Sequence, residues 1–226
     1  SVVVVGAGWI GLEVAAAARA AGGTVTLVEA ADAPLAGVLD QQIAAVFADL
    51  HRERGVDLHT ATTITAVKQE GQSHTVVRLS DQSEHAVDTI LVGIGAEPNT
   101  DLAASAGLAT GNGILVDACL RSSDANVYAA GDVSGFPVKQ GGLATQQADV
   151  AAEAIAAGLG VAIEPAEFDP VLRGVLWTGS EPLYLQGWPT GGHGENSTMT
   201  VTPPWGEDHG KIVGRHLTEF LAGVTA

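Results

Sequence analysis

The stretch that decides the fold is Gly-Ala-Gly-Trp-Ile-Gly-Leu-Glu-Val at residues 6–14. It follows a run of valines at residues 2–5 and leads into an alanine-rich segment, an order typical of a strand, a tight turn and a helix. In this G-x-G-x-x-G pattern the first glycine permits the turn, the second lets the backbone approach phosphates, and the third lets the helix pack closely on the strand. The pattern therefore predicts a dinucleotide whose pyrophosphate lies on the helix N-terminus. The binding residues that we expect in this turn are Gly6, Gly8, Trp9, Ile10 and Gly11.

A carboxylate at the end of the next expected strand supports dinucleotide binding. Glu29 lies 18 residues after Gly11, at the tip of residues 24–28, where it can accept hydrogen bonds from a ribose diol. Its negative charge would repel the 2′-phosphate of NADPH, and residues 30–37 contain no arginine to bind that phosphate, so we expect NADH to be preferred. The alternative is a glycine-rich strand–helix turn in an unrelated α/β protein.

Composition narrows the functional classes. The 226 residues have room for one large or two modest domains. The 10 basic and 26 acidic side chains give a net charge of −16, which disfavours binding to nucleic-acid phosphates or to an anionic membrane surface. The single cysteine, Cys119, excludes an internal disulfide, and we expect it to be a small buried side chain. No apolar run approaches the ~20 residues that span a bilayer, and we expect a cytoplasmic protein.

The first hundred residues predict an α/β domain with one irregular feature. After the helix at 9–21 and the strand at 24–29, apolar spacing predicts a helix that ends at Gly55. Three short strands with hairpin turns then stand where a simple doubly wound fold would have a helix, and a buried strand follows them. The expected ranges are a helix at 40–54, short strands at 56–60, 64–67 and 74–79, turns at 71–73 and 81–83, and the buried strand at 89–94.

The remainder of the chain predicts two further parts. A returning α/β segment covers residues 101–164, and a C-terminal hairpin, loop and helix cover 165–226. The expected elements are a short helix at 102–106, strands at 114–116 and 126–130, a long helix from 142 or 143 to 158, a hairpin at 171–178 and 182–187, a polar loop at 190–197 and a final helix at 208–222. That final helix has an apolar side formed by Ile212, Val213, Leu217, Phe220 and Leu221. We expect this side to dock on protein rather than on a membrane, in a homodimer in preference to a contact with its own chain.

Three motifs in a fixed order resemble a known superfamily. They are V-V-V-V-G-A-G-W-I-G-L-E at 2–13, G-I-G-A-E-P-N at 93–99 and V-Y-A-A-G-D at 127–132. As a set they resemble the FAD-dependent pyridine nucleotide-disulfide oxidoreductases over residues 1 to about 160. The tail, with V-L-R-G-V-L-W-T-G at 171–179 and P-P-W at 203–205, looks like the type II NADH dehydrogenase and sulfide:quinone reductase branch.

The resemblance implies a fold class, an activity and two cofactors. In that superfamily an NADH-binding domain is inserted into an FAD-binding domain. The chain would then be a Rossmann-like NAD(P)-binding domain with a three-stranded β-meander (residues 1–100), the returning half of an FAD-binding domain (101–164) and a C-terminal α+β piece (165–226), without the first FAD-binding half. The cofactors would be FAD and NAD, with hydride passing from NADH to flavin and on to a quinone, a disulfide or a protein acceptor. The alternative is a non-catalytic NAD-binding or redox-sensing module.

The superfamily also implies roles for residues near the flavin. The carboxylate of Asp132, after Gly131, would accept a hydrogen bond from the ribityl chain, and the alternative is an aspartate that caps a loop. The N-terminus of the following helix, at Leu143 and Ala144, would face the flavin pyrimidine edge and stabilise its negative charge when reduced. Gln146, with its neighbour Gln147, would lie near the flavin and a quinone, and solvent-exposed glutamines are the alternative.

Further roles concern the nicotinamide side of the site. Glu13 would lie beside the nicotinamide as the catalytic carboxylate, with a surface glutamate as the alternative. Trp9 would match a gating aromatic over the flavin, and core packing is an equal alternative. The loop at Gly95, Ala96 and Glu97 would approach the dinucleotide, or would simply be a turn at the end of a strand.

Two kinds of site are not indicated by the sequence. No C-x-x-C or C-x-x-x-x-C pair occurs, and no cysteine follows residue 119 where sulfide:quinone reductases use one, which disfavours sulfide oxidation. We expect no metal site, because the histidines show no metal-ligand spacing. They are His51, His59, His74, His85, His193, His209 and His216.

Overall fold

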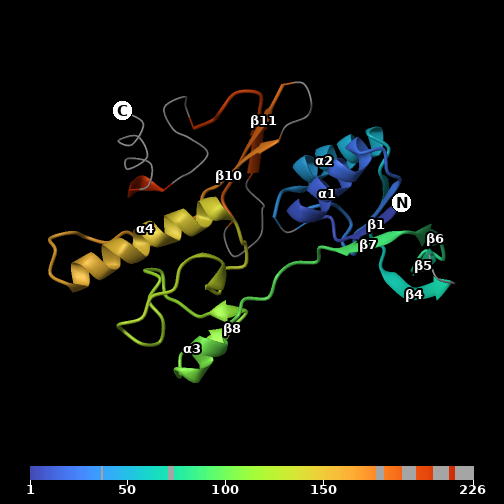
Figure 1. Ribbon diagram of the computed structural model, residues 1–226. Helices are drawn as coiled ribbons and strands as arrows, with labels where there is room; N and C mark the ends of the chain where they lie inside the picture. Colours follow the sequence, from blue (N-terminus) through green and yellow to red (C-terminus); the bar gives the residue numbers. More distant parts are fainter. Residues whose placement is uncertain (37, 71–73, 177–180, 190–196, 206–213, 217–226) are drawn as a thin grey trace. The chain divides into compact units, whose positions relative to one another are not determined.

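The computed structural model describes residues 1–36, 38–70, 74–176, 181–189, 197–205 and 214–216. It divides into two compact units, Ser1–Ala96 and Glu97–Ala226 (Figure 1). We describe each unit by itself.

A parallel sheet organises the first unit. Its strand order is β3-β2-β1-β7. The strands are β1 (Val2–Val5), β2 (Val25–Val28), β3 (Asp57–His59) and β7 (Thr89–Val92), and every pairing between them is parallel. Val3 and Val4 of β1 are fully buried. An uninterrupted run of valines suits β1 because a parallel strand inside an α/β unit is covered on both faces.

Two helices pack together beside this sheet. They are α1 (Trp9–Ala20) and α2 (Gln41–Glu53). The carboxylate of Asp40 caps α2 by accepting the N–H groups of Gln42 and Ile43, which satisfies two of the amides that a helix start leaves open. Phe47 of α2 is 2% exposed, and the Trp9 ring packs edge-on against it with ring centroids 5.8 Å apart. Phe47 is therefore a central contact between the two helices.

A β-meander covers the sheet as well. It consists of β4 (Ile64–Glu70), β5 (His74–Leu79) and β6 (Glu84–Val87), paired in that order and antiparallel. Its buried side chains join those of the sheet in one apolar cluster formed by Val3, Val28, Val77, Leu79 and Val87. The meander therefore takes the place of a helical layer, as the sequence predicts.

The membership of the meander differs from the sequence prediction. The sequence predicts the strand at 56–60 as one of the three hairpin strands, but β3 pairs with β2 in the parallel sheet. The third meander strand is β6, which was not predicted. Its sequence, Glu-His-Ala-Val, shows little apolar alternation, and it becomes a strand because it pairs with β5. The position of β3 after α2 makes it the third strand of a βαβαβ unit, which places it beside β2.

The second unit combines a long helix with short strands. Its elements are α3 (Asp101–Ser105), β8 (Thr110–Gly111), β9 (Gly113–Ile114), the 3-10 turn η1 (Gly131–Val133), α4 (Gly141–Gly158), β10 (Leu172–Leu176), β11 (Leu183–Gly187) and β12 (Ser197–Thr200). The last three strands form an antiparallel sheet in the order β10-β11-β12. Val150 and Ala151 of α4 form a buried cluster with Leu120, and Tyr128 and Phe168 pack on this cluster.

Several predictions for this unit need correction. The segment 126–130 is not a strand, because only an isolated bridge between Arg121 and Tyr128 forms there. The strand expected at 114–116 is reduced to β9, and β12 adds a third strand to the predicted hairpin. Cys119 is half-buried rather than fully buried.

The predicted C-terminal helix lies largely outside the described residues. Of the range 208–222 only 214–216 are described, and the apolar side chains of that helix are not among them. The homodimer that this helix suggested therefore stays a prediction. Among the helices that the structure does describe, none combines the length and apolarity needed to cross a membrane.

We predict that Phe47→Ala lowers the free energy of unfolding by about 3–5 kcal/mol, because it leaves a cavity between α1 and α2. Urea denaturation followed by far-UV circular dichroism measures the loss. Val67→Ala is the matched control, because Val67 is 53% exposed on β4, and we expect it to cost about 1 kcal/mol or less. Equal losses in the two variants would contradict the central packing of Phe47.

Candidate functional site

The strand order of the parallel sheet reverses at β1. From β1 the chain runs through α1 to β2 on one side, whereas β7 pairs with β1 on the other side. Ligands of open α/β sheets bind outside the carboxyl ends of the strands at such a switch point. Here Gly6 follows β1 and Gly93 follows β7, so both glycines lie at this edge.

Two of the predicted glycines are required by close backbone packing. Gly6 has a φ of +94°, and a Cβ placed on it would lie 2.5 Å from the carbonyl oxygen of Gly93. A Cβ on Gly11 would overlap the carbonyl oxygen of Gly6. Because neither position can accept a side chain, the turn brings α1 into direct backbone contact with the end of β1.

The second glycine of the motif, Gly8, faces open space. Gly8 is the N-cap residue of α1 with an extended backbone, and a Cβ on it would meet nothing within 4 Å. No side chain of the described residues caps this helix, and its first turn carries no acidic residue. The amides at the start of α1, including those of Trp9 and Ile10, therefore leave an uncapped helix N-terminus, the feature that binds phosphate groups.

Glu29 lies beside this turn. Its Oε2 accepts the N–H of Ala7 at 2.6 Å, and its Oε1 accepts the N–H of Ala31 at 2.8 Å. The two bonds hold the carboxylate between the glycine turn and the end of β2. Each carboxylate oxygen keeps a second lone pair, so Glu29 can still accept a ribose hydroxyl. The structure thus brings Glu29 to the same edge as the glycines.

The other residues predicted for the nicotinamide side have different surroundings. Trp9 packs on Phe47, which supports the core-packing alternative for its ring. Glu13 is exposed on α1. Gly95, with a φ of +108°, and Ala96 are exposed after β7, and a Cβ on Gly95 would meet nothing within 4 Å. Glu97 is exposed at the start of the second unit.

In the second unit, the side chain of Gln147 fixes the loop that carries Asp132. Gln147 is 3% exposed, and its Oε1 accepts the N–H of Gly131 at 2.6 Å and the hydroxyl of Ser134 at 3.3 Å. Asp132 itself is exposed, and no described residue donates a hydrogen bond to its carboxylate. The predicted strand end is therefore a 3-10 turn, η1, that is attached to α4 and presents Asp132 outward.

The start of α4 differs from the prediction. The helix begins at Gly141, and its N-cap is Gln140, whose Oε1 accepts the N–H of Leu143 at 2.9 Å. The N–H of Ala144 bonds to the Gln140 carbonyl. In the described part of the chain, the first-turn amides without a partner are therefore those of Gly141 and Gly142, not those of Leu143 and Ala144.

Gln146 is neither solvent-exposed nor free to bind a ligand through its amide protons. It is 8% exposed, and its Nε2 donates to the carbonyls of Gly142 and Val171, each at 2.9 Å. Its Oε1 accepts the N–H of Val171 at 2.9 Å. Gln146 therefore joins α4 to the segment before β10, and the alternative of exposed glutamines is wrong for both Gln146 and Gln147.

Sequence reasoning missed two residues at this site. Lys139 donates from Nζ to the carbonyl of Ser134 at 2.6 Å. Burial lowers its pKa, and the charge of Asp132 opposes that shift. Gln140 caps α4, although glutamine is not among the preferred cap residues. Neither residue carried a sequence signal, because their roles depend on how the loop 134–140 folds back on η1.

Both a protein family and a known relative match this chain. The family described as pyridine nucleotide-disulphide oxidoreductase matches residues 1–158. Over 139 residues the chain is 45% identical to rhodocoxin reductase of Rhodococcus erythropolis, an alignment that covers 61% of this chain and 32% of the relative.

Two solved reductase structures also resemble this chain. The ferredoxin reductase for the CYP199A2 system from Rhodopseudomonas palustris has a TM-score of 0.70 at 35% identity and covers 83% of this chain and 47% of its own. The putidaredoxin reductase in a covalent complex with putidaredoxin has a TM-score of 0.69 at 29% identity, with coverages of 83% and 46%. The chain thus spans about a third of the curated relative and about half of each solved structure.

We predict that Gly11→Ala lowers the free energy of unfolding by about 1–3 kcal/mol, because its Cβ overlaps the Gly6 carbonyl. Gly8→Ala is the control within the same motif and should stay within about 0.5 kcal/mol, because its Cβ enters open space. Thermal and urea unfolding of both variants measure this difference. A destabilised Gly8→Ala with an unaffected Gly11→Ala would overturn the assignment of the two glycines.

Proposed function

The chain belongs to the pyridine nucleotide-disulphide oxidoreductase family, and from this premise we propose that it is the NADH-binding part and a portion of the FAD-binding part of a flavoprotein reductase. The family membership confirms the resemblance carried by the three sequence motifs. The observation that carries the proposal is the uncapped start of α1, with Gly8 facing open space and Glu29 beside it at the switch point of the sheet.

The residues of the first unit fit an NADH molecule. The amides at the start of α1 would hold the pyrophosphate, and Glu29 would accept the adenosine ribose hydroxyls. The backbone at Gly95 and Ala96, open after β7, would let the nicotinamide half approach the sheet edge. The exposed carboxylate of Glu13 would orient the nicotinamide carboxamide.

The residues of the second unit fit one side of FAD. Asp132 would accept a ribityl hydroxyl, and the amides of Gly141 and Gly142 would face the flavin pyrimidine edge. Lys139, beside Asp132, adds a positive charge to this region. When bound, the flavin supplies the hydride chemistry, and the chain supplies position and charge. We propose residues 1–100, 101–164 and 165–226 as the three functional segments.

We propose a small redox protein of the ferredoxin type as the electron acceptor. One observation supports a protein acceptor: a structural relative is the putidaredoxin reductase solved in complex with putidaredoxin. This proposal replaces the type II dehydrogenase and sulfide:quinone reductase branch that the tail motifs suggested.

The alternative is an NAD-binding or redox-sensing module without turnover. The two proposals differ in one measurement on the full-length protein. A reductase transfers electrons from NADH to a ferredoxin over many turnovers, whereas a sensing module binds NADH without turnover. We also propose a cytoplasmic location, consistent with a chain that carries no disulfide, and a homodimer.

We predict that the chain binds NADH more tightly than NADPH, because the Glu29 carboxylate repels a 2′-phosphate. Glu29→Gln keeps an acceptor for Ala7 but removes the charge, and it should reduce this preference by about 1 kcal/mol. Asp49→Asn, on the exposed side of α2, is the control of equal charge change. Calorimetric titration with both cofactors measures the preference, and tighter NADPH binding by the unmodified chain would refute the role of Glu29.

We predict that the 226-residue chain does not retain FAD. It contains one G-x-G-x-x-G turn, which is assigned here to NADH, so no second such turn is present for the FAD pyrophosphate. Mixing the chain with excess FAD, desalting it and recording the visible spectrum tests this. Full-length protein treated in the same way is the control and should stay yellow. Stoichiometric flavin on the 226-residue chain would show that Asp132 and α4 suffice for binding.

A further inference from the structure

Two histidines and two aspartates meet at the rim of the core between the parallel sheet and the meander. Asp57 and His59 come from β3, and because they are two residues apart they point to the same face of that strand. His85 comes from β6, where it lies opposite the buried Val77 and so faces the sheet. The apolar cluster between the two layers thus brings β3 and β6 together at its edge.

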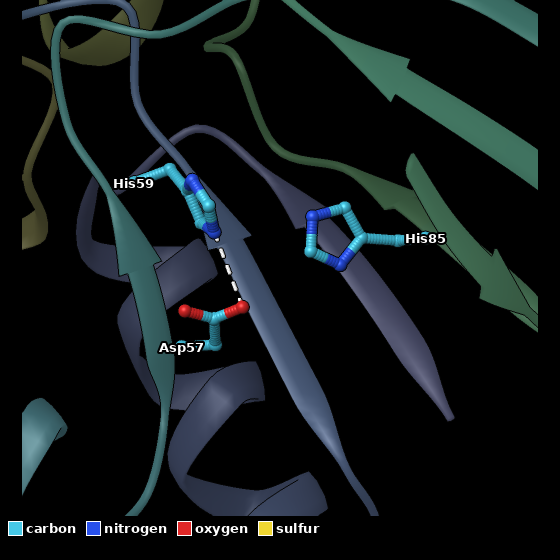
Figure 2. Close-up of side chains that lie close together, drawn as sticks. All are labelled: Asp57, His59 and His85. Carbon is cyan, nitrogen blue, oxygen red and sulfur yellow. Dashed lines mark hydrogen bonds and ion pairs between the residues drawn. The ribbon is translucent and has the colours of Figure 1, made fainter. Parts of the chain in front are cut away.

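The potential ligand atoms are close to one another. One carboxylate oxygen of Asp57 and one ring nitrogen each of His59 and His85 all lie within 4.8 Å of one another. Figure 2 shows the three side chains converging from the two layers, with the bond between His59 and Asp57 drawn. The Nε2 of His59 lies 3.1 Å from Oδ2 of Asp57. That separation already approaches the spacing of neighbouring ligands around a tetrahedral metal, whose bonds are about 2.0–2.2 Å long.

The surroundings of each imidazole also match those of a metal ligand. The Nδ1 of His59 faces Oδ2 of Asp81 at 2.8 Å, the carboxylate–histidine arrangement that fixes the tautomer of metal-bound histidines. Asp81 is itself held by the N–H and the hydroxyl of Ser83. The ring nitrogens of His85 face the hydroxyls of Ser83 at 3.1 Å and Thr26 at 3.3 Å, so either hydroxyl can orient the nitrogen that binds no metal.

We propose that Asp57, His59 and His85 form a binding site for a divalent transition-metal ion of the Zn²⁺ class that joins β3 to the meander. Two imidazoles and one carboxylate favour Zn²⁺, Co²⁺ or Ni²⁺ over Mg²⁺ and Ca²⁺, which prefer oxygen ligands. The exposed side of Asp57 leaves room for water as a fourth ligand. No sequence pattern indicates this site, because its ligands come from two strands that only the tertiary fold brings together.

Asp81 also determines how His59 would bind the metal. The metal would bind Nε2 of His59, and Asp81, whose Oδ2 lies 2.8 Å from Nδ1, would keep the proton on that nitrogen.

The test uses the untagged 226-residue chain freed of metal with a chelator. We expect one equivalent of Zn²⁺ to bind in calorimetric titration and to raise the melting temperature further as the free Zn²⁺ concentration increases, whereas Mg²⁺ has no effect. Co²⁺ should give the intense visible absorption of a tetrahedral nitrogen–oxygen site. If Co²⁺ shows only the weak spectrum of the hydrated ion, the proposal is overturned.

Variants separate the cluster from other histidines. His85→Gln should abolish the bound equivalent. Asp81→Asn leaves the three ligands in place but alters the group that faces Nδ1 of His59, and it should weaken Zn²⁺ affinity by about tenfold to a hundredfold. His216→Gln removes an exposed histidine outside the cluster and should bind Zn²⁺ like the unmodified chain. Melting curves with chelator establish that each variant is folded. Equal Zn²⁺ affinity in His85→Gln and His216→Gln would refute the site.

Discussion

The backbone contact between Gly11 and Gly6 is the constraint on which the first unit depends. The carbonyl of Gly6 occupies the space that a side chain at Gly11 would need, so α1 starts directly against the end of β1. This contact sets the first turn of α1 at the carboxyl edge of the sheet, beside the end of β7. Glu29 then ties the same turn to the end of β2 through the N–H of Ala7. A helix N-terminus and a carboxylate are thus positioned by strands rather than by a free loop, which is how a binding site is preorganised.

The β-meander covers the sheet with antiparallel strands instead of a helix. Antiparallel strands bury Val77, Leu79 and Val87 against the sheet, and the turn between β5 and β6 lies beside β3. Polar side chains at the edge of this packed region can contact residues of the sheet while they stay partly exposed to water. The turn at Asp81 and the strand residue His85 approach β3 in this way. The same apolar packing that stabilises the unit therefore also assembles its cluster of histidines and aspartates.

In the second unit, the buried side-chain amides of two glutamines join separate segments of the chain. Gln146 and Gln147 are adjacent on α4 and point to different neighbours, the backbone of Val171 and the loop at Gly131. A buried amide is stable only when its donors and acceptors have partners. Both ends of the Gln146 amide have partners within the chain, and Oε1 of Gln147 accepts two hydrogen bonds. Because η1 is attached to α4 in this way, Asp132 and the open amides of Gly141 and Gly142 are held by the same helix.

The sequence by itself determined the elements whose cause is local. The absence of a Cβ at Gly6, Gly8 and Gly11 predicted the strand, turn and helix of residues 2–20, and the apolar spacing after Asp40 predicted α2. The three motifs together indicated the family, and the hairpin of β10 and β11 followed from its strand and turn residues.

Only the tertiary structure decided which distant segments meet. It placed β3 in the parallel sheet, packed Trp9 on Phe47, turned Gln146 toward Val171 and brought His59 to His85. Propensity and periodicity describe a residue's own segment, whereas these contacts depend on the partner that burial supplies from elsewhere in the chain.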